Sequence, residues 1–172
     1  MSDPATAPVT DAADELAQAL VDRLIARRWT VAVAESLTGG LVVASLVSIP
    51  GASAAVRGGI VAYATDLKHT LLGVDAALLA SEGPVHPEVA RQMAVGVRGV
   101  AGREGVGADV GIATTGVAGP TSQDGKPVGS VYIAVATPAG VRVESLALAG
   151  TRAQIRSEAT RSALAIALET TV

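Results

Sequence analysis

The chain has 172 residues, 13 lysine and arginine residues against 16 aspartate and glutamate residues, and no cysteine, a length that suits one domain. The missing cysteines exclude disulfides, zinc–cysteine sites and a thiol nucleophile, and His69 and His86 stand in no ligand motif, so we expect neither a metal nor a cofactor. A net charge of −3 and an aromatic content of 2% disfavour nucleic-acid partners, and the apolar runs are shorter than the ~20 residues that a membrane span requires.

The N-terminal residues 1–9 are rich in proline and alanine and lack a basic start followed by an apolar stretch. We predict a disordered tail rather than a signal peptide, a cytoplasmic location, and a single folded domain over residues 10–172. Leucine, isoleucine and valine recur at helical spacing over residues 10–28, with acidic residues in the first turn and arginines in the last. This pattern predicts an amphipathic helix.

Short apolar runs then alternate with helical patterns along the chain. The predicted strands cover residues 30–34, 58–63, 109–115, 128–137 and 141–148, and the predicted later helices cover residues 38–48, 64–72, 87–101 and 151–169. The alternation, which ends in a hairpin, indicates an α/β fold in which helices pack on both faces of a mixed β-sheet, in three layers α/β/α. Ligands of such sheets bind at loops beyond the strand ends.

The first of three candidate loops has the sequence AESLTGG at residues 34–40. Ser36 ends a strand, and Thr38 follows as the expected cap of a helix that begins beside Gly39 and Gly40. The serine hydroxyl would then lie beside free backbone N–H groups at a helix N-terminus, which can hold an oxyanion or a phosphate. The alternative is an ordinary turn in which serine and threonine only cap the helix.

The second loop places Tyr63 at a strand end and Lys68 more than one helical turn later. The chain has no G-x-S-x-G elbow and no suitably placed histidine, so a lysine is the alternative base for a serine nucleophile. The spacing differs from the Tyr-x-x-x-Lys of hydride-transferring reductases, and no G-x-G-x-x-G motif is present. A packing tyrosine and a solvated lysine are the alternative.

The third loop joins the strands predicted at 109–115 and 128–137 and is rich in glycine and proline. Glycines at this density allow the backbone to approach a ligand closely. Lys126 lies in this loop but not in a Walker A frame. A plain connection between two strands is the alternative.

Arg152 and Arg156 lie in the first turns of the last predicted helix, where the helix dipole disfavours cations by ~0.3–1 kcal/mol each. Their i, i+4 spacing places them on one face. An anionic ligand would explain them, and so would pairing with Glu144 or with an adjacent subunit.

Taken together, these segments resemble the CinA C-terminal domain family, the nicotinamide-nucleotide amidases. The resemblance covers residues 11–168 and rests on the fragments AESLTGG at 34–40, GIVAYATDLK at 59–68, TGVAGP at 115–120, KPVGSV at 126–131 and GTRAQIR at 150–156. Leu37 stands where the family usually has cysteine, and Thr115 and His86 stand where it usually has serine. The chain resembles the stand-alone form, which lacks the N-terminal molybdopterin-binding-like domain of many relatives.

The resemblance implies hydrolysis of the carboxamide of nicotinamide mononucleotide to nicotinate mononucleotide and ammonia, in pyridine nucleotide recycling and without a cofactor or metal. It implies Ser36 as the nucleophile, Lys68 as the general base and Tyr63 as an assisting hydroxyl.

We further expect a set of substrate-binding residues on the three loops and the last helix: Thr38, Gly39, Gly40, Thr115, Gly116, Gly119, Lys126 and Arg152. The expected partner is this small nucleotide, with no nucleic acid and no membrane, and the expected assembly is a homo-oligomer, in the simplest case a dimer. The alternative function is a catalytically silent nucleotide-binding or protein-interaction module linked to competence or the DNA damage response. A silent relative would have lost the serine and lysine, and a DNA-linked module would show a basic or aromatic surface.

Overall fold

Five strands form one sheet in the order β2-β1-β3-β4-β5 in the computed structural model, which describes residues 12–172. The strands are β1 (Val31–Glu35), β2 (Val56–Val61), β3 (Val110–Gly116), β4 (Ser130–Thr137) and β5 (Gly140–Ala147). β1 pairs in parallel with both β2 and β3, whereas β3 with β4 and β4 with β5 are antiparallel. The predicted mixed sheet with a final hairpin is therefore confirmed.

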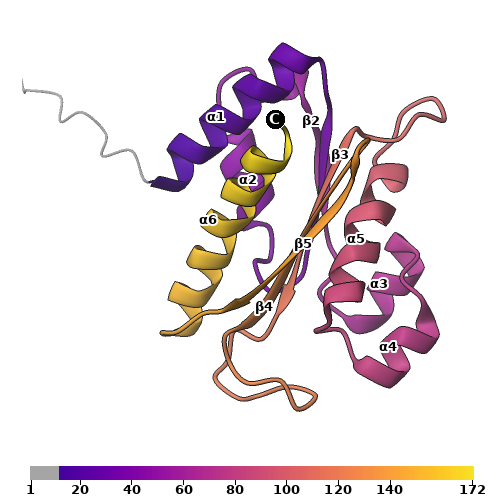
Figure 1. Ribbon diagram of the computed structural model, residues 1–172, viewed down its shortest axis with the longest axis vertical. Coiled ribbons are helices and arrows are strands. Elements are labelled where there is room, and N and C mark those ends of the chain that lie inside the picture. The colour runs from indigo at the N-terminus through magenta and orange to yellow at the C-terminus, as the bar shows by residue number, and fades with distance from the viewer. Residues whose placement is uncertain (1–11) are drawn as a thin grey trace, which may run out of the picture.

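Helices cover both faces of this sheet (Figure 1). One face carries α1 (Ala12–Arg27), α2 (Leu41–Val47) and α6 (Arg152–Thr170), and the other carries α3 (Thr65–Leu72), α4 (Ala76–Glu82) and α5 (Pro87–Val100). The prediction of a three-layer α/β/α domain is confirmed for the described residues. The predicted tail at 1–9 lies outside them, and no helix of residues 12–172 is long and apolar enough to cross a bilayer.

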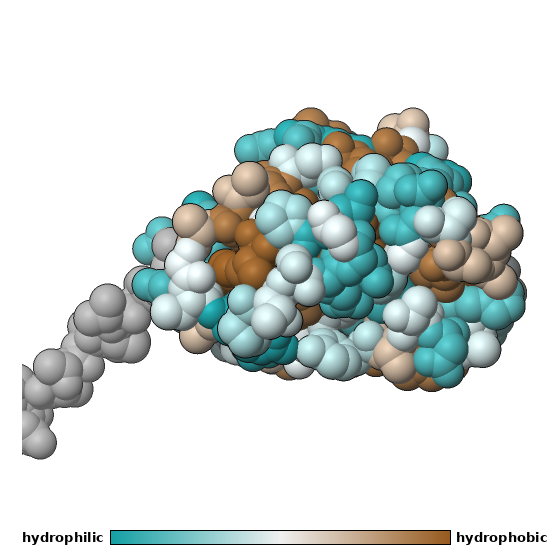
Figure 2. Space-filling model, turned by 90° about the horizontal axis from the view of Figure 1, so that it is seen from below, coloured by the Kyte–Doolittle hydropathy of each residue, from teal (hydrophilic) through white to brown (hydrophobic). Residues whose placement is uncertain are grey.

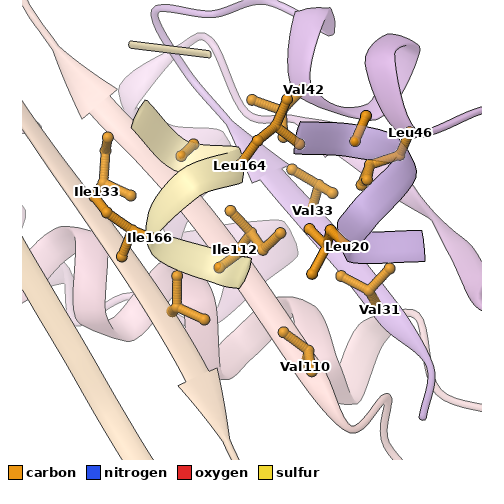
Figure 3. Packing of buried hydrophobic residues seen from close by; sticks show 14 of the residues in the cluster. Leu20, Val31, Val33, Val42, Leu46, Val110, Ile112, Ile133, Leu164 and Ile166 are labelled. Carbon is orange, nitrogen blue, oxygen red and sulfur yellow. The ribbon is translucent and has the colours of Figure 1, made fainter. Parts of the chain in front are cut away.

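Two apolar cores lie on the two sides of the sheet. The larger one joins the sheet to α1, α2 and α6 through branched side chains such as Leu20, Ile112 and Leu164 (Figure 3). The second one, under α5, consists mostly of alanine and valine. Small side chains are needed there, because a Cβ at Gly111 would lie 2.0 Å from the Ala94 carbonyl oxygen of α5. The alanine-rich composition thus serves close packing of α5 on the sheet.

The sequence predictions place the strand β2 two residues late, start one helix too early and miss another helix. The helix predicted over residues 38–48 begins only at Leu41, with Gly40 as its N-cap in a left-handed conformation. No helix or strand is predicted for residues 74–82, but they contain α4, whose N-cap Asp75 accepts hydrogen bonds from two backbone N–H groups. An aspartate cap followed by a glycine at residue 83 is the local signal for this short helix.

Candidate active site

A cavity of about 290 Å³ lies at the carboxyl ends of β1 and β3. Its lining comes from Ser36 and Leu37 after β1, Tyr63, Thr65 and Lys68 after β2, Pro84 and Val85 before α5, residues 115–119 and 121–123 at and after the end of β3, and Arg152 at the start of α6. Figure 2 views the molecule from this end and shows a largely hydrophilic surface with separate hydrophobic areas. The three predicted loops therefore contribute to one polar cavity.

Lys68 and Ser36 meet inside this cavity. The Lys68 side chain is completely buried, and its Nζ lies 3.1 Å from Ser36 Oγ and donates a 2.7 Å hydrogen bond to the Ala62 carbonyl oxygen. Ser36 is itself only 8% exposed. The structure thus places a hydroxyl and an amine, from residues 32 positions apart, in hydrogen-bond contact.

Burial also changes the acidity of this amine. It lowers the pKa of Lys68 from 10.5 to about 8, and the nearby Asp66 carboxylate opposes that shift. A neutral amine has one lone pair and two hydrogens. It can therefore accept the Ser36 proton while it still donates to Ala62, which is the arrangement that a general base requires.

The alternation of side chains along β1 explains why Ser36 faces Lys68. Glu35, the preceding residue, points to the opposite face of the sheet, where Oε2 accepts from the Gly40 and Val42 N–H groups and Oε1 from Val43. The Glu35 side chain is completely buried and caps α2. The prediction that Thr38 caps this helix is wrong, because Glu35 fills that role.

We expect the substitution Glu35→Gln to lower the free energy of unfolding by about 2–3 kcal/mol, since hydrogen bonds to a charged acceptor are the strong ones. Glutamine has only one acceptor oxygen, and its NH₂ group would face a backbone N–H. Urea denaturation measures the change, with Glu169→Gln as the control. Glu169 pairs with Arg142 at the surface, so its loss should cost less than ~1 kcal/mol. Equal stability of the two variants would contradict the capping role.

Two buried threonine contacts fix the loops around the cavity. The hydroxyls of Thr38 and Thr114 lie 2.7 Å apart, and both side chains are completely buried. Thr115 lines the cavity and donates a 2.7 Å hydrogen bond to the Pro84 carbonyl oxygen. The Thr115 hydroxyl therefore holds the segment before α5 and can offer a ligand only its lone pairs.

Arg152 lies at the mouth of the cavity. Its guanidinium donates to the Gly119 carbonyl oxygen at 2.7 Å and to the Tyr63 hydroxyl at 3.0 Å. Of the alternatives for this arginine, pairing with Glu144 is wrong, since Glu144 pairs with Arg142. Tyr63 is 59% exposed, so it lies at the surface beside the cavity that it lines.

The remaining predicted binding residues lie outside the lining. Gly39 and Gly40 have φ angles of +61° and +100°, and a Cβ at Gly39 would lie 3.2 Å from the Arg156 guanidinium, so the backbone itself requires these glycines. Lys126 lies at a short turn and forms two backbone hydrogen bonds with Gln123, which does line the cavity. Thr38 is also absent from the lining, because its side chain points to Thr114.

The sequence predictions missed several residues that shape the site, among them Glu35, Pro84, Val85 and Gln123. A signal for Glu35 existed, because an acidic residue one position before a strand-end serine must face the opposite side of the sheet. Among residues 12–172 no three His, Cys, Asp or Glu side chains are placed to hold a metal ion. Metal-independent catalysis stays a prediction.

Comparison with known proteins supplies independent information. The family model described as the CinA C-terminal domain matches residues 13–171. A CinA-like protein of Frankia casuarinae is 50% identical over 88% of the chain, and one of Anaeromyxobacter is 46% identical over 88%, but these matches cover only 34% and 36% of those relatives. The chain thus spans about a third of the length of these curated relatives.

Two solved structures resemble this chain along nearly their whole length. A competence-damaged protein (CinA) superfamily protein of Klebsiella pneumoniae is 31% identical, with a TM-score of 0.86 over 92% of this chain and 97% of that one. A competence/damage inducible protein of Agrobacterium tumefaciens is 34% identical, with a TM-score of 0.84 over 95% of this chain and 99% of that one.

Proposed function

The chain belongs to the CinA C-terminal domain family, and we propose that its cavity hydrolyses the carboxamide of nicotinamide mononucleotide to nicotinate mononucleotide and ammonia. The observation that carries this proposal is the 3.1 Å contact between Ser36 Oγ and the buried Nζ of Lys68. A serine paired with a low-pKa lysine is a nucleophile–base arrangement suited to amide hydrolysis. The choice of a pyridine nucleotide rests on the family resemblance.

Acylation begins when neutral Lys68 removes the Ser36 proton and Oγ attacks the carboxamide carbon. The oxyanion needs donors, and among the described residues the N–H groups of Leu37 and Thr38 have no hydrogen-bond partner. The Gly39 N–H, which the sequence pattern also suggested, instead donates to the Ser36 carbonyl oxygen at 3.2 Å. Leu37 and Thr38 therefore form the proposed oxyanion site.

The tetrahedral intermediate collapses when the C–N bond breaks and the departing nitrogen takes the proton from Lys68. Ammonia leaves, and an ester joins the nicotinoyl group to Ser36. Water then attacks this ester, with Lys68 again as the base, and releases the carboxylate product. The Tyr63 hydroxyl, which accepts a hydrogen bond from Arg152, is the assisting proton donor at the cavity mouth.

This mechanism predicts a pH profile. Because Lys68 must be neutral and its pKa is about 8, kcat/KM should rise about tenfold per pH unit below pH 8 and level off above it. Lowering the pH protonates the amine and removes the base. Initial rates of ammonia release in matched buffers measure the profile, and a rate that does not change from about pH 6 to about pH 9 would contradict a lysine base.

The substrate phosphate should provide binding energy that orients the carboxamide. Arg152 contributes a positive charge to the lining, and the neighbouring polar side chains of residues 121–123 also line the cavity. Nicotinamide riboside, which lacks only the phosphate, should have a kcat/KM lower by about 10²-fold or more, and free nicotinamide lower still. Arg152→Met should reduce kcat/KM for the mononucleotide much more than for the riboside. Similar values for both substrates would mean that these loops serve the backbone only.

The direct test is release of ammonia and nicotinate mononucleotide by the purified protein. Equimolar products at a rate proportional to enzyme concentration are expected. The names of several relatives refer to competence and damage, which corresponds to the alternative of a silent binding module. Binding of the nucleotide without turnover at any pH would favour that alternative.

A further inference from the structure

The clearest feature that the proposed mechanism does not use is the Arg156 side chain. We infer that Arg156 is a positioning residue that holds the loop after Ser36 in the conformation of an oxyanion site, an inference that rests on the proposed function. The sequence suggested that Arg156 pairs with Glu144 or binds an anion. The structure instead directs its guanidinium to two successive carbonyl groups of its own chain.

The contacts are specific. Arg156 Nε donates to the Leu37 carbonyl oxygen at 2.9 Å, and Nη2 donates to the Thr38 carbonyl oxygen at 2.8 Å. The guanidinium is planar and rigid, so two bonds from it fix the orientation of both peptide groups. The side chain is half-buried, and Gly39 leaves the room that it occupies.

This orientation determines where the N–H groups point. In a trans peptide the C=O and the following N–H point in opposite directions. Because Arg156 holds the Leu37 carbonyl, the Thr38 N–H is directed away from the guanidinium. That N–H is one of the two donors near Ser36 without a partner among the described residues.

The loop is held on its other sides as well. The Ser36 N–H donates to the Thr114 carbonyl oxygen at 3.0 Å, and Glu35 holds the N–H groups of Gly40, Val42 and Val43. Arg156 is the charged group that acts on the peptides between these anchors. Its positive charge polarises those peptides and strengthens the N–H as a donor to a developing oxyanion.

The position of the charge supports this role. Arg156 lies near the N-terminus of α6, where the helix dipole disfavours a cation. Capping of α6 is completed by Thr151 and Gln154, so the arginine is not needed there. The two carbonyl contacts account for its presence.

The test compares steady-state rates of Arg156→Met, Arg156→Lys and wild type on nicotinamide mononucleotide. We expect Arg156→Met to lower kcat by about 10–100-fold with little change in KM, because binding is kept and the transition state loses its donors. Arg156→Lys, which can bond one carbonyl, should lie between the two. The matched control is Arg161→Met on the same helix, which removes an exposed partner of Glu158 and should leave the rates unchanged.

A second readout does not need the nucleotide. A fluorophosphonate reacts with Ser36 by forming an Oγ–P bond, while fluoride departs and the serine proton passes to Lys68, and its phosphoryl oxygen occupies the oxyanion site. We expect Arg156→Met to be labelled much more slowly than wild type, and millimolar guanidinium to restore part of the rate in Arg156→Ala. Melting temperatures identify variants that fail to fold. If Arg156→Met does not fold, the comparison of Arg156→Lys with wild type decides the test.

The outcomes separate the two proposals. A wild-type protein that is labelled at Ser36 but releases no ammonia would contradict the proposed substrate and keep the role of Arg156. Equal kcat and equal labelling rates in wild type, Arg156→Met and Arg156→Lys would overturn that role. A higher KM with an unchanged kcat in the variants would also overturn it. A wild-type protein that the reagent does not label would also overturn it.

Discussion

Ser36→Ala should abolish ammonia release from nicotinamide mononucleotide, with a loss of at least ~10³-fold in kcat, because no other hydroxyl contacts Lys68 Nζ among the described residues. The fold should persist. Alanine removes one hydrogen bond from Lys68, which changes the free energy of unfolding by about 1 kcal/mol or less. Coupled ammonia detection and urea denaturation measure the two effects on the same preparation.

The control for this substitution is Ser48→Ala. Ser48 is exposed, its hydroxyl donates to the Ser45 carbonyl oxygen at the end of α2, and it does not line the cavity. Its activity should equal that of wild type. Ammonia release by Ser36→Ala at more than a few per cent of the wild-type rate would mean that Ser36 is not the nucleophile.

Lys68→Arg should be about as inactive as Lys68→Met, with a loss of about 10²–10⁴-fold in kcat/KM. Arginine stays protonated at every accessible pH, so it keeps the charge but cannot accept the serine proton. Methionine has a similar length and lacks both charge and base. Substantial activity in Lys68→Arg would reduce Lys68 to a positioning charge.

The same residue affects stability in a predictable direction. Its pKa is about 8 in the folded protein, against an ordinary value of 10.5 in the unfolded chain. Between these values the unfolded chain binds more protons, so the stability contributed by Lys68 rises with pH through this window, by about 3 kcal/mol in total. Lys68→Met lacks this contribution. The unfolding free energy of wild type minus that of this variant should therefore increase by about that amount as the pH rises through the window.

The fold was largely predictable because its signals are local. The strands β1 and β3 are short branched runs between turns, and α5 and α6 carry a proline and a threonine at their N-termini. The start of α2 was not predictable from the usual caps, because its capping group is the carboxylate of Glu35 in the preceding strand. A cap that reaches back across a loop lies outside the positions that the usual capping rules consider.

The cavity lining was predictable at the residues proposed to carry the chemistry and less so at those that support them. Ser36, Tyr63 and Lys68 from the first two predicted loops line the same cavity as Arg152 from the last helix. Their supporting contacts depend on distant elements: Arg156 reaches a loop 118 residues earlier in the chain. Periodicity and capping rules say nothing about such pairs, which only the packing of α6 on the sheet brings together.

Hydroxylamine trapping tests the acyl-enzyme on Ser36 most directly. A serine ester that forms before water attacks can be captured by this stronger nucleophile. With increasing hydroxylamine, the nucleotide hydroxamate should replace nicotinate mononucleotide as the product of the wild-type protein, while ammonia is released at the same rate as without hydroxylamine. Ser36→Ala should form neither product. Unchanged nicotinate mononucleotide without hydroxamate, or equal hydroxamate formation by Ser36→Ala, would contradict an ester on Ser36.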